Sequence, residues 1–218
     1  MNDRPSESGY VYIARHGETE WNKIKRYQGF LDSPLTPKGE WQAGVVGRFL
    51  KNKNISAIFS SPLGRCLMTS AQVSEALGLS VEVLPALREM DFGRFQGRYQ
   101  KDVKNHPFFE QRVGRKLHVK FPGGESYHDV YERIRSNVLD IHSIVGEENI
   151  VIIGHESVNR IVRAIITGIP LEEAVKNKQP NNMIVRCQFG SSTETMAQVA
   201  TSKFPLDQPD IDKTMRNK

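Results

Sequence analysis

Short apolar runs of strand type alternate with amphipathic helical stretches along this chain. The apolar run 10–14 precedes a stretch at 37–51 whose apolar residues recur at helical spacing, and the run 55–59 precedes a second such stretch that ends near residue 77. Another short strand is expected at 81–84. Because parallel strands must be joined by crossover connections, usually helices, this alternation predicts an α/β fold with a mostly parallel central sheet covered by helices on both faces.

Residues that cap helices mark where several of these helices begin. Thr36 with Pro37 combines an N-cap side chain with a proline in the first turn, and Ser60-Ser61-Pro62 repeats this signal for the second helix. Ser126 with Asp129 has the spacing of a capping box. The later elements are expected as a helix at 130–145, a buried strand at 149–154, a helix from there to about 166, and strands at 183–189 and 195–200.

Residues 88–125 interrupt this alternation with glycines and prolines around a helix-like middle. We interpret about 90–125 as an insertion over the strand ends, where loops often determine specificity. The segment from residue 98 to residue 120 is rich in Lys and Arg, and such a basic stretch either attracts a small anionic substrate or is a solvated helix face. Nucleic acid is not an expected partner, because no RNP, KH or zinc-finger pattern accompanies the charge. Its seven basic residues, set against Asp102 and Glu110, match the net charge of +5 and are Arg98, Lys101, Lys104, Arg112, Arg115, Lys116 and Lys120.

The composition is that of an ordinary globular domain, with 218 residues, 38% of them hydrophobic and 25% charged. We expect a polar segment at 1–9, one domain at 10–200, and a polar tail at 201–218 of the kind that is often disordered. No signal-peptide pattern and no apolar run near 18 residues is present, which predicts a cytoplasmic protein outside the membrane. Cys66 and Cys187 belong to no CxxC or Cys/His cluster, so we expect reduced thiols and no metal site.

Two histidines, His16 and His155, each follow an apolar strand directly, so a parallel sheet would place both at the same edge. Arg15 precedes the first histidine, and Arg65 lies in the first turn of the helix opened by Ser61-Pro62. Guanidinium groups bind phosphate oxygens bidentately, and helix N-termini add partial positive charge. This set of residues suits phosphoryl transfer without Mg²⁺, in which a neutral His16 attacks phosphorus to give a phosphohistidine.

Such a reaction needs an acid that protonates the leaving alkoxide. Glu89 follows the strand expected at 81–84 and is one candidate. Glu18, Glu20 and Asp91 are competing carboxylates, and position in the sequence alone does not decide among them.

Several segments together resemble the histidine phosphatase superfamily, the phosphoglycerate-mutase-like proteins, over about residues 10 to 200. The resemblance implies a three-layer α/β/α sandwich. It also implies that His16 is the phosphorylated nucleophile, that Glu89 is the proton donor, and that the phosphoryl group is held by Arg15, Arg65, His155 and Asn22. The segments are Arg15-His16-Gly17-Glu18-Thr19 with Asn22, Leu35-Thr36 with Gly39, Ser60-Ser61-Pro62-Leu63-Gly64-Arg65, Leu87-Arg88-Glu89, Pro122-Gly123-Gly124-Glu125-Ser126 and Gly154-His155.

The segment 87–97 is more similar to the small phosphatase branch of that family than to its mutases. The resemblance therefore implies a metal-independent phosphatase, without a cofactor, that hydrolyses a small phosphorylated metabolite through a phosphohistidine. A phosphoglycerate-type mutase and a regulatory or binding member with weak turnover are the alternatives. The oligomeric state stays open.

Glu156 departs from the pattern of the family, because many members have glycine directly after the second histidine. A carboxylate that faces the pocket would oppose anion binding, whereas one that faces outward would complement the N-terminus of the following helix. We expect Glu156 to face outward.

Other catalytic signatures fail on individual residues. An HExxH zinc motif from His155 is broken at Asn159, a cysteine-phosphatase loop from Cys66 is broken at Gln72, and a DxDxT match at 210–214 lies in the polar tail. We expect the remaining histidines to be surface or structural residues; they are His106, His118, His128 and His142.

Overall fold

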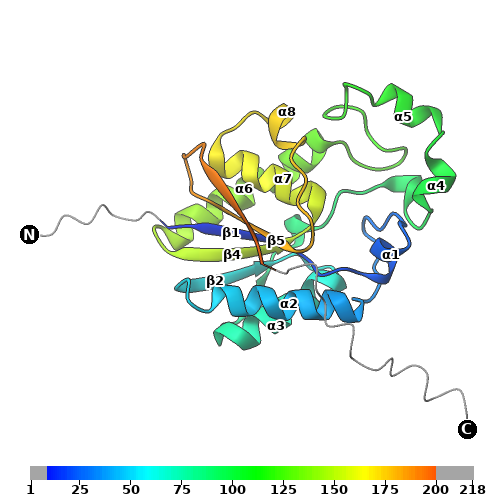
Figure 1. Ribbon diagram of the computed structural model, residues 1–218. Coiled ribbons are helices and arrows are strands. Elements are labelled where there is room, and N and C mark those ends of the chain that lie inside the picture. Colours follow the sequence, from blue (N-terminus) through cyan, green and yellow to red (C-terminus); the bar gives the residue numbers. More distant parts are fainter. Residues whose placement is uncertain (1–8, 200–218) are drawn as a thin grey trace, which may run out of the picture.

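The computed structural model describes residues 9–199, so the expected tail at 201–218 and nearly all of the segment 1–9 lie outside the described residues. A six-stranded sheet with the order β3-β2-β4-β1-β5-β6 forms the centre of the molecule (Figure 1). The first four strands in that order are parallel, and the last two are antiparallel to their neighbours. Their bounds are β1 Val11–Arg15, β2 Ile55–Ser60, β3 Val81–Val83, β4 Asn149–Gly154, β5 Met183–Cys187 and β6 Glu194–Gln198.

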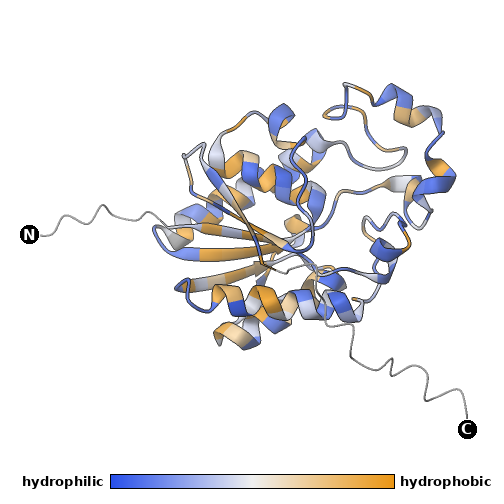
Figure 2. Ribbon diagram, in the orientation of Figure 1, coloured by the Kyte–Doolittle hydropathy of each residue, from blue (hydrophilic) through white to orange (hydrophobic). Residues whose placement is uncertain are grey.

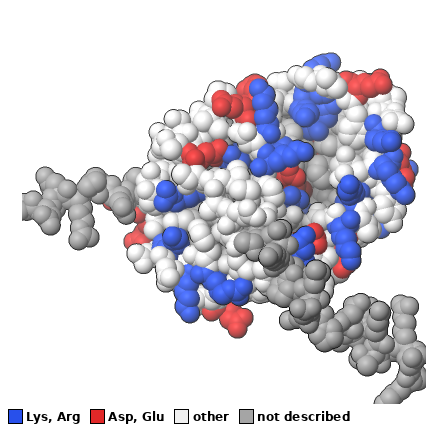
Figure 3. Space-filling view, in the orientation of Figure 1, with Lys and Arg blue, Asp and Glu red and all other residues white. Residues whose placement is uncertain are grey.

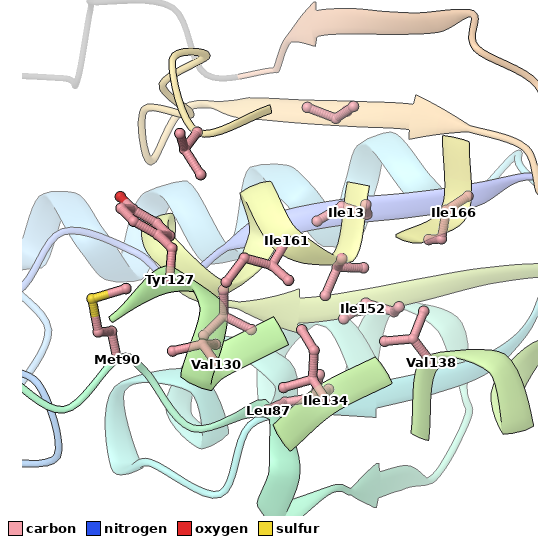
Figure 4. Packing of buried hydrophobic residues seen from close by; sticks show 14 of the residues in the cluster. Ile13, Leu87, Met90, Tyr127, Val130, Ile134, Val138, Ile152, Ile161 and Ile166 are labelled. Atoms are coloured by element: carbon pink, nitrogen blue, oxygen red, sulfur yellow. The ribbon is translucent and has the colours of Figure 1, made fainter. Parts of the chain in front are cut away.

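Helices cover both faces of this sheet, and alternate residues of each strand serve the two faces. On β4, Ile150 and Ile152 belong to the core cluster that includes α6 and α7, whereas Val151 and Ile153 pack with α2 and α3. Figure 4 shows Ile134 and Ile161 of the first cluster packed close to Ile152. Each fully buried side chain of this size contributes about 1.5–3 kcal/mol. The helices are α2 Pro37–Leu50, α3 Gly64–Leu77, α6 Tyr127–Val145 and α7 Glu156–Thr167.

The arrangement confirms the three-layer α/β/α sandwich with a mostly parallel sheet. The strands are largely hydrophobic, and the helices have hydrophilic residues on their outer sides (Figure 2). Among residues 9–199 we find no helix that is both long and apolar enough to span a membrane. The cytoplasmic location stays a prediction.

Two of the expected helix starts are confirmed and one is wrong. The Thr36 hydroxyl accepts the Gly39 N–H at 3.0 Å, and Ser126 and Asp129 form the capping box of α6. The helix α3, however, begins at Gly64 with Leu63 at the N-cap, and Leu63 makes no side-chain cap. The Asp32 carboxylate, from a distant loop, accepts the first backbone N–H groups of α3 instead, which frees Ser61 for another role.

The insertion contains only short helical pieces, and its aromatic side chains join the core cluster of α6 and α7. Phe108 and Phe121, for example, lie with their ring centroids 4.8 Å apart. A bridge between Arg26 and Tyr99 connects the insertion to the loop after α1, and both lie on the same side of the molecule (Figure 1). The short elements are α1 Glu20–Lys23, η1 Pro85–Leu87, η2 Gly93–Phe95, α4 Gln100–Val103, α5 Pro107–Gln111 and α8 Leu171–Ala174; the sequence reasoning missed α1 and α8.

Candidate active site

The two histidines lie side by side because β1 and β4 are adjacent parallel strands in which Arg15 is opposite Gly154. The next residue of each strand is therefore a histidine, and the ring centroids of His16 and His155 are 5.3 Å apart. Both side chains are buried. This confirms that the histidines share one edge of the sheet.

The ring of His16 is held in one tautomer. Its Nδ1 lies 2.8 Å from the carbonyl oxygen of Gly17, and because a carbonyl only accepts, Nδ1 carries the proton and Nε2 keeps its lone pair. Burial, followed by the positive charges of Arg65 and Arg15, holds the pKa of His16 well below its usual value of 6.5. His16 is thus a neutral imidazole with a free Nε2 at neutral pH.

Gly17 is required for close packing rather than for a left-handed turn, because its φ is not positive. A Cβ on Gly17 would lie 2.2 Å from the carbonyl oxygen of Gly39 at the start of α2. The Gly17 N–H donates to the Thr69 hydroxyl at 3.0 Å, and Asn181 donates to the His16 carbonyl oxygen at 2.6 Å. These contacts fix the backbone that carries the nucleophile candidate.

Arg15 and Arg65 provide positive charge with unmet hydrogen-bond donors. Arg65 is 1% exposed and donates to the carbonyl oxygens of Leu31 and Gly29 and to the Asp32 carboxylate, at 2.8–2.9 Å. The Nε atoms of Arg15 and Arg65 are nevertheless buried without any hydrogen-bond partner. A buried donor left unpaired costs roughly 1–3 kcal/mol, more if charged, so these two groups favour the binding of an anion.

His155 is anchored from the other side of the site. Its Nε2 lies 2.7 Å from the Ser61 hydroxyl. Ser61, which does not cap α3, thus forms a hydrogen bond with His155 instead. Burial, with the positive charges of Arg65 and Arg15, lowers the pKa of His155 well below its usual value. Cys66 lies 3.4 Å from the same Nε2, and burial raises its thiol pKa to about 12, so Cys66 is a protonated packing residue and not a nucleophile.

Glu89 is 7% exposed and accepts the Met90 N–H at 2.8 Å. Burial raises the pKa of Glu89, against the opposing effects of the Met90 hydrogen bond and of Arg65 and Arg15. Arg133 of α6 holds the loop that carries this carboxyl group, since it donates to the carbonyl oxygens of Arg88 and Glu89 at 3.1 and 3.3 Å. Burial of this kind favours the protonated form of the carboxyl group, which is the form that a proton donor needs.

The competing carboxylates are engaged elsewhere. Glu18 pairs with Lys38 at 3.0 Å, Glu20 lies in the first turn of α1, and Asp91 accepts the Gly93 N–H at 2.7 Å. None of these three lines the pocket next to His16, whereas Glu89 does.

That pocket has a volume of about 140 Å³. Five of the six predicted site residues line it, and the sixth, His155, lies fully buried next to His16. One of the five is Asn22, whose Oδ1 also caps α1 by accepting the Thr19 N–H at 3.2 Å. The lining residues are Arg15, His16, Asn22, Arg26, Tyr27, Gln28, Gly29, Arg65, Glu89, Phe92, Gln100, Glu156 and Ser157.

Glu156 lines this pocket, so the expectation that it faces outward is wrong. Its Oε2 lies 3.5 Å from Arg15, and its Oε1 forms an ion pair with Arg160 one turn later in α7. The pairing with Arg15 explains the difference, because Arg15 lines the pocket and attracts the carboxylate toward it. Burial lowers the pKa of Arg15, and the charge of Glu156 opposes that effect. The same charge adds to the effect of burial, which raises the pKa of Glu89.

Sequence reasoning missed several residues that shape the site, chiefly Asp32, Arg133 and the pairing of Glu156 with Arg160. Asp32 and Arg133 act through contacts with residues in distant elements, so no local pattern marked them. Glu156 and Arg160 have the i, i+4 spacing of a helical ion pair, which was the available signal for that pair. The four remaining histidines are exposed, as expected. Within residues 9–199, no group of three or more His, Cys, Asp or Glu side chains is arranged to hold a metal ion.

Comparison with known proteins agrees with this geometry. The model of the histidine phosphatase superfamily, branch 1, matches residues 11–201. The chain belongs to this superfamily. As a histidine phosphatase, the protein is an enzyme of the phosphoric monoester hydrolase type.

Two relatives illustrate the range of this histidine phosphatase's similarities. It is 31% identical to phosphoserine phosphatase 1 of Hydrogenobacter thermophilus over 165 residues, which cover 75% of this chain and 78% of the relative. It is 29% identical to a probable phosphoglycerate mutase, GpmB, of Salmonella choleraesuis over 212 residues, which cover 94% and 99% of the two chains.

Solved structures confirm the fold of the histidine phosphatase. A putative alpha-ribazole-5'-P phosphatase from Escherichia coli superposes with a TM-score of 0.78 at 22% identity and covers 89% of this chain and 97% of its own. A mycobacterial glucosyl-3-phosphoglycerate phosphatase in complex with VO3 superposes with a TM-score of 0.75 at 26% identity and covers 82% and 90%.

Proposed function

We propose that this histidine phosphatase hydrolyses a small phosphorylated metabolite through a phosphohistidine on His16, without a metal ion. The observation that carries the proposal is the neutral His16 with a free Nε2 beside two buried guanidinium groups with unpaired Nε atoms. The pocket volume of about 140 Å³ supports a small substrate, because sites for drug-sized ligands span roughly 300–1,000 Å³.

In the first step, His16 Nε2 attacks phosphorus and the bond between phosphorus and the ester oxygen breaks. Glu89 gives its proton to the leaving alkoxide, and Arg15, Arg65, Asn22 and His155 hold the phosphoryl oxygens. In the second step, water attacks the phosphohistidine while the Glu89 carboxylate takes a proton from that water. Inorganic phosphate leaves, and His16 and Glu89 return to their starting states.

A phosphoglycerate-type mutase is the second candidate, favoured by the similarity to GpmB along nearly the whole chain. A mutase would pass the phosphoryl group from the histidine to another substrate oxygen, whereas a phosphatase passes it to water. A regulatory member that binds phosphate esters with weak turnover is the third candidate.

Release of inorganic phosphate from a panel of phosphorylated metabolites, with phosphoserine and 3-phosphoglycerate among them, tests the proposal. We expect phosphate release with at least one substrate, no loss of rate in EDTA, and no release by His16→Ala. Isomer exchange of 3-phosphoglycerate with a trace of its bisphosphate, without phosphate release, would instead identify a mutase. Tight binding of these esters without turnover would identify the regulatory member.

A further inference from the structure

Arg26, a third arginine, lines the same pocket from the loop after α1. Its Nε donates to the carbonyl oxygen of Gly97, and its guanidinium lies 4.3 Å from the centre of the Trp21 ring and 5.3 Å from that of Tyr99. The two rings and the backbone bond fix the plane of the guanidinium. Little side-chain entropy would be lost if it then bound a ligand.

The terminal nitrogens of Arg26 have no protein partner within the described residues. No Asp or Glu of residues 9–199 forms an ion pair with Arg26, and the only hydrogen bond from its side chain there is the one to Gly97. The arginines deeper in the protein differ, because Arg65, Arg160 and Arg163 are each paired with a carboxylate. Arg26 therefore lines the pocket with guanidinium N–H groups that have no partner among the described residues.

The phosphoryl group of the substrate does not require the Arg26 guanidinium, because Arg15 and Arg65 already lie next to His16 in the pocket. The Arg26 guanidinium, in the same small pocket, is then available to bind the leaving group of the substrate. Tyr99 and Gln100 bring the insertion to this place, and Gln100 also lines the pocket.

The basic residues of the insertion do not fill this role. Arg98, Lys101, Lys104, Arg112, Arg115, Lys116 and Lys120 are all described, and none of them lines the pocket. Arg112 packs its guanidinium 4.4 Å from the centre of the Phe121 ring and leaves its Nε buried and unpaired. Direct contact with the substrate by this patch is thus not supported.

We propose that Arg26 is a specificity-determining residue that binds a second anionic group, a carboxylate or a phosphate, on the leaving group of the substrate. The inference rests on the proposed function, since it takes the phosphate ester to be cleaved at His16. The preferred substrates are small phosphomonoesters with two anionic groups.

A matched pair of substrates tests the proposal. 3-Phosphoglycerate carries a carboxylate where glycerol 3-phosphate carries a hydroxymethyl group, and glycerol 1,3-bisphosphate carries a phosphate on that carbon, so the three distinguish the two kinds of anion. We expect wild type to prefer a member of the set that carries a second anionic group besides the phosphate that is cleaved. Arg26→Met, which keeps an unbranched chain between Trp21 and Tyr99, should lower kcat/KM for that member by roughly ten- to a hundredfold, the loss expected for a charged hydrogen bond.

The same variant should change kcat/KM for glycerol 3-phosphate and p-nitrophenyl phosphate by less than about threefold, since neither offers a second anion to the guanidinium. Arg94→Met removes an exposed arginine outside the pocket and should leave kcat/KM unchanged for all four substrates. Equal losses of kcat/KM on all substrates, or no preference of wild type for a substrate with a second anionic group, would overturn the proposal.

A binding measurement separates this inference from the catalytic proposal. Calorimetric titration of 3-phosphoglycerate and of glycerol 1,3-bisphosphate into His16→Ala, with and without Arg26→Met, needs no turnover. We expect the second substitution to weaken binding of one of these two ligands roughly ten- to a hundredfold. Unchanged binding of both ligands would refute the role of Arg26, whereas loss of binding with no phosphatase activity in wild type would refute only the proposed function.

Discussion

At the scale of single residues, the site depends on two carboxylates with different surroundings. Glu89 is buried with one backbone hydrogen bond, whereas Glu156 forms ion pairs with Arg15 and Arg160. Burial raises the pKa of Glu89, and the charge of Glu156 adds to that effect. A carboxyl group that holds its proton next to one that is paired with cations is the arrangement expected when only the first acts as an acid.

Glu89→Gln removes the transferable proton but keeps the shape of the side chain. The rate of phosphoenzyme formation should fall roughly a hundred- to ten-thousandfold with an alkoxide leaving group and far less with p-nitrophenyl phosphate, whose leaving group needs little protonation. Single-turnover kinetics on the two substrates measures this difference. Equal losses on both would remove Glu89 from the acid role.

The pH profile of the same step follows from the direction of the Glu89 pKa. Because the acid must be protonated and its pKa is raised, phosphorylation by an alkyl ester should be constant below that pKa and should fall as the pH rises through it. The falling limb should be absent in Glu89→Gln, and its persistence there would assign it to another group.

At the scale of elements, the turn after β1 packs directly on the first turn of α2. A Cβ on Gly39 would lie 2.0 Å from the carbonyl oxygen of Glu18, and one on Gly17 would lie 2.2 Å from the carbonyl oxygen of Gly39. Backbone atoms cannot move aside as the end of a long side chain can. The position of His16 is therefore tied to the position of α2.

Gly39→Ala should lower the free energy of unfolding by about 1–3 kcal/mol, the usual cost of overpacking, and should lower activity by shifting the backbone near His16. Gly44→Ala in the same helix is the matched control, since its Cβ would meet only the ends of the Gln72 and Arg48 side chains. The control should be neutral or more stable by up to about 1 kcal/mol, because alanine favours helix. Urea denaturation compares the two, and equal stabilities would contradict the packing argument.

Elements that local patterns specify were predicted well, and elements that distant contacts specify were not. Thr36, Ser126 and the apolar run 149–154 marked their helices and strand correctly, because caps and buried strands act within a few residues. The start of α3 was misplaced because Asp32 caps it from elsewhere. The orientation of Glu156 depends on Arg15, and no spacing in the sequence reports that contact.

At the scale of the whole molecule, we expect the basic insertion to affect the encounter with substrate rather than contact with it. Lys and Arg side chains are visible on the side of the molecule where the insertion lies, and also elsewhere on the face in view (Figure 3). Lys101, Arg115 and Lys116 are exposed there and do not line the pocket. Charges of this kind raise the local concentration of anions, and salt screens their effect.

Replacing Lys101, Arg115 and Lys116 together with Ala should lower kcat/KM for an anionic substrate by roughly tenfold at low ionic strength, the lower end of electrostatic steering. In this triple variant, kcat/KM should depend less on the salt concentration, and kcat should not change. Replacement of Arg48, Lys51 and Lys53, near the opposite edge of the sheet, removes the same charge and should have a smaller effect. If both triple variants behave as wild type, the patch is only a solvated surface.

The strand order explains why the site could be predicted from so few residues. With β1 next to β4, the residues after both strands meet at one edge, and the parallel sheet expected from the alternation of elements already implied that edge. The size of the pocket and the position of its third arginine, Arg26, depend on how the insertion packs on the loop after α1, which was not predicted from the sequence.

Rapid quench of the wild-type enzyme during a single turnover of p-nitrophenyl phosphate, followed by peptide mapping, tests most directly whether His16 is the nucleophile. We predict an acid-labile, base-stable phosphoryl group on His16 that forms as fast as p-nitrophenol appears and that is absent from His16→Ala. Release of p-nitrophenol without a phosphoenzyme, a phosphoryl group on another residue, or an active His16→Ala would contradict it.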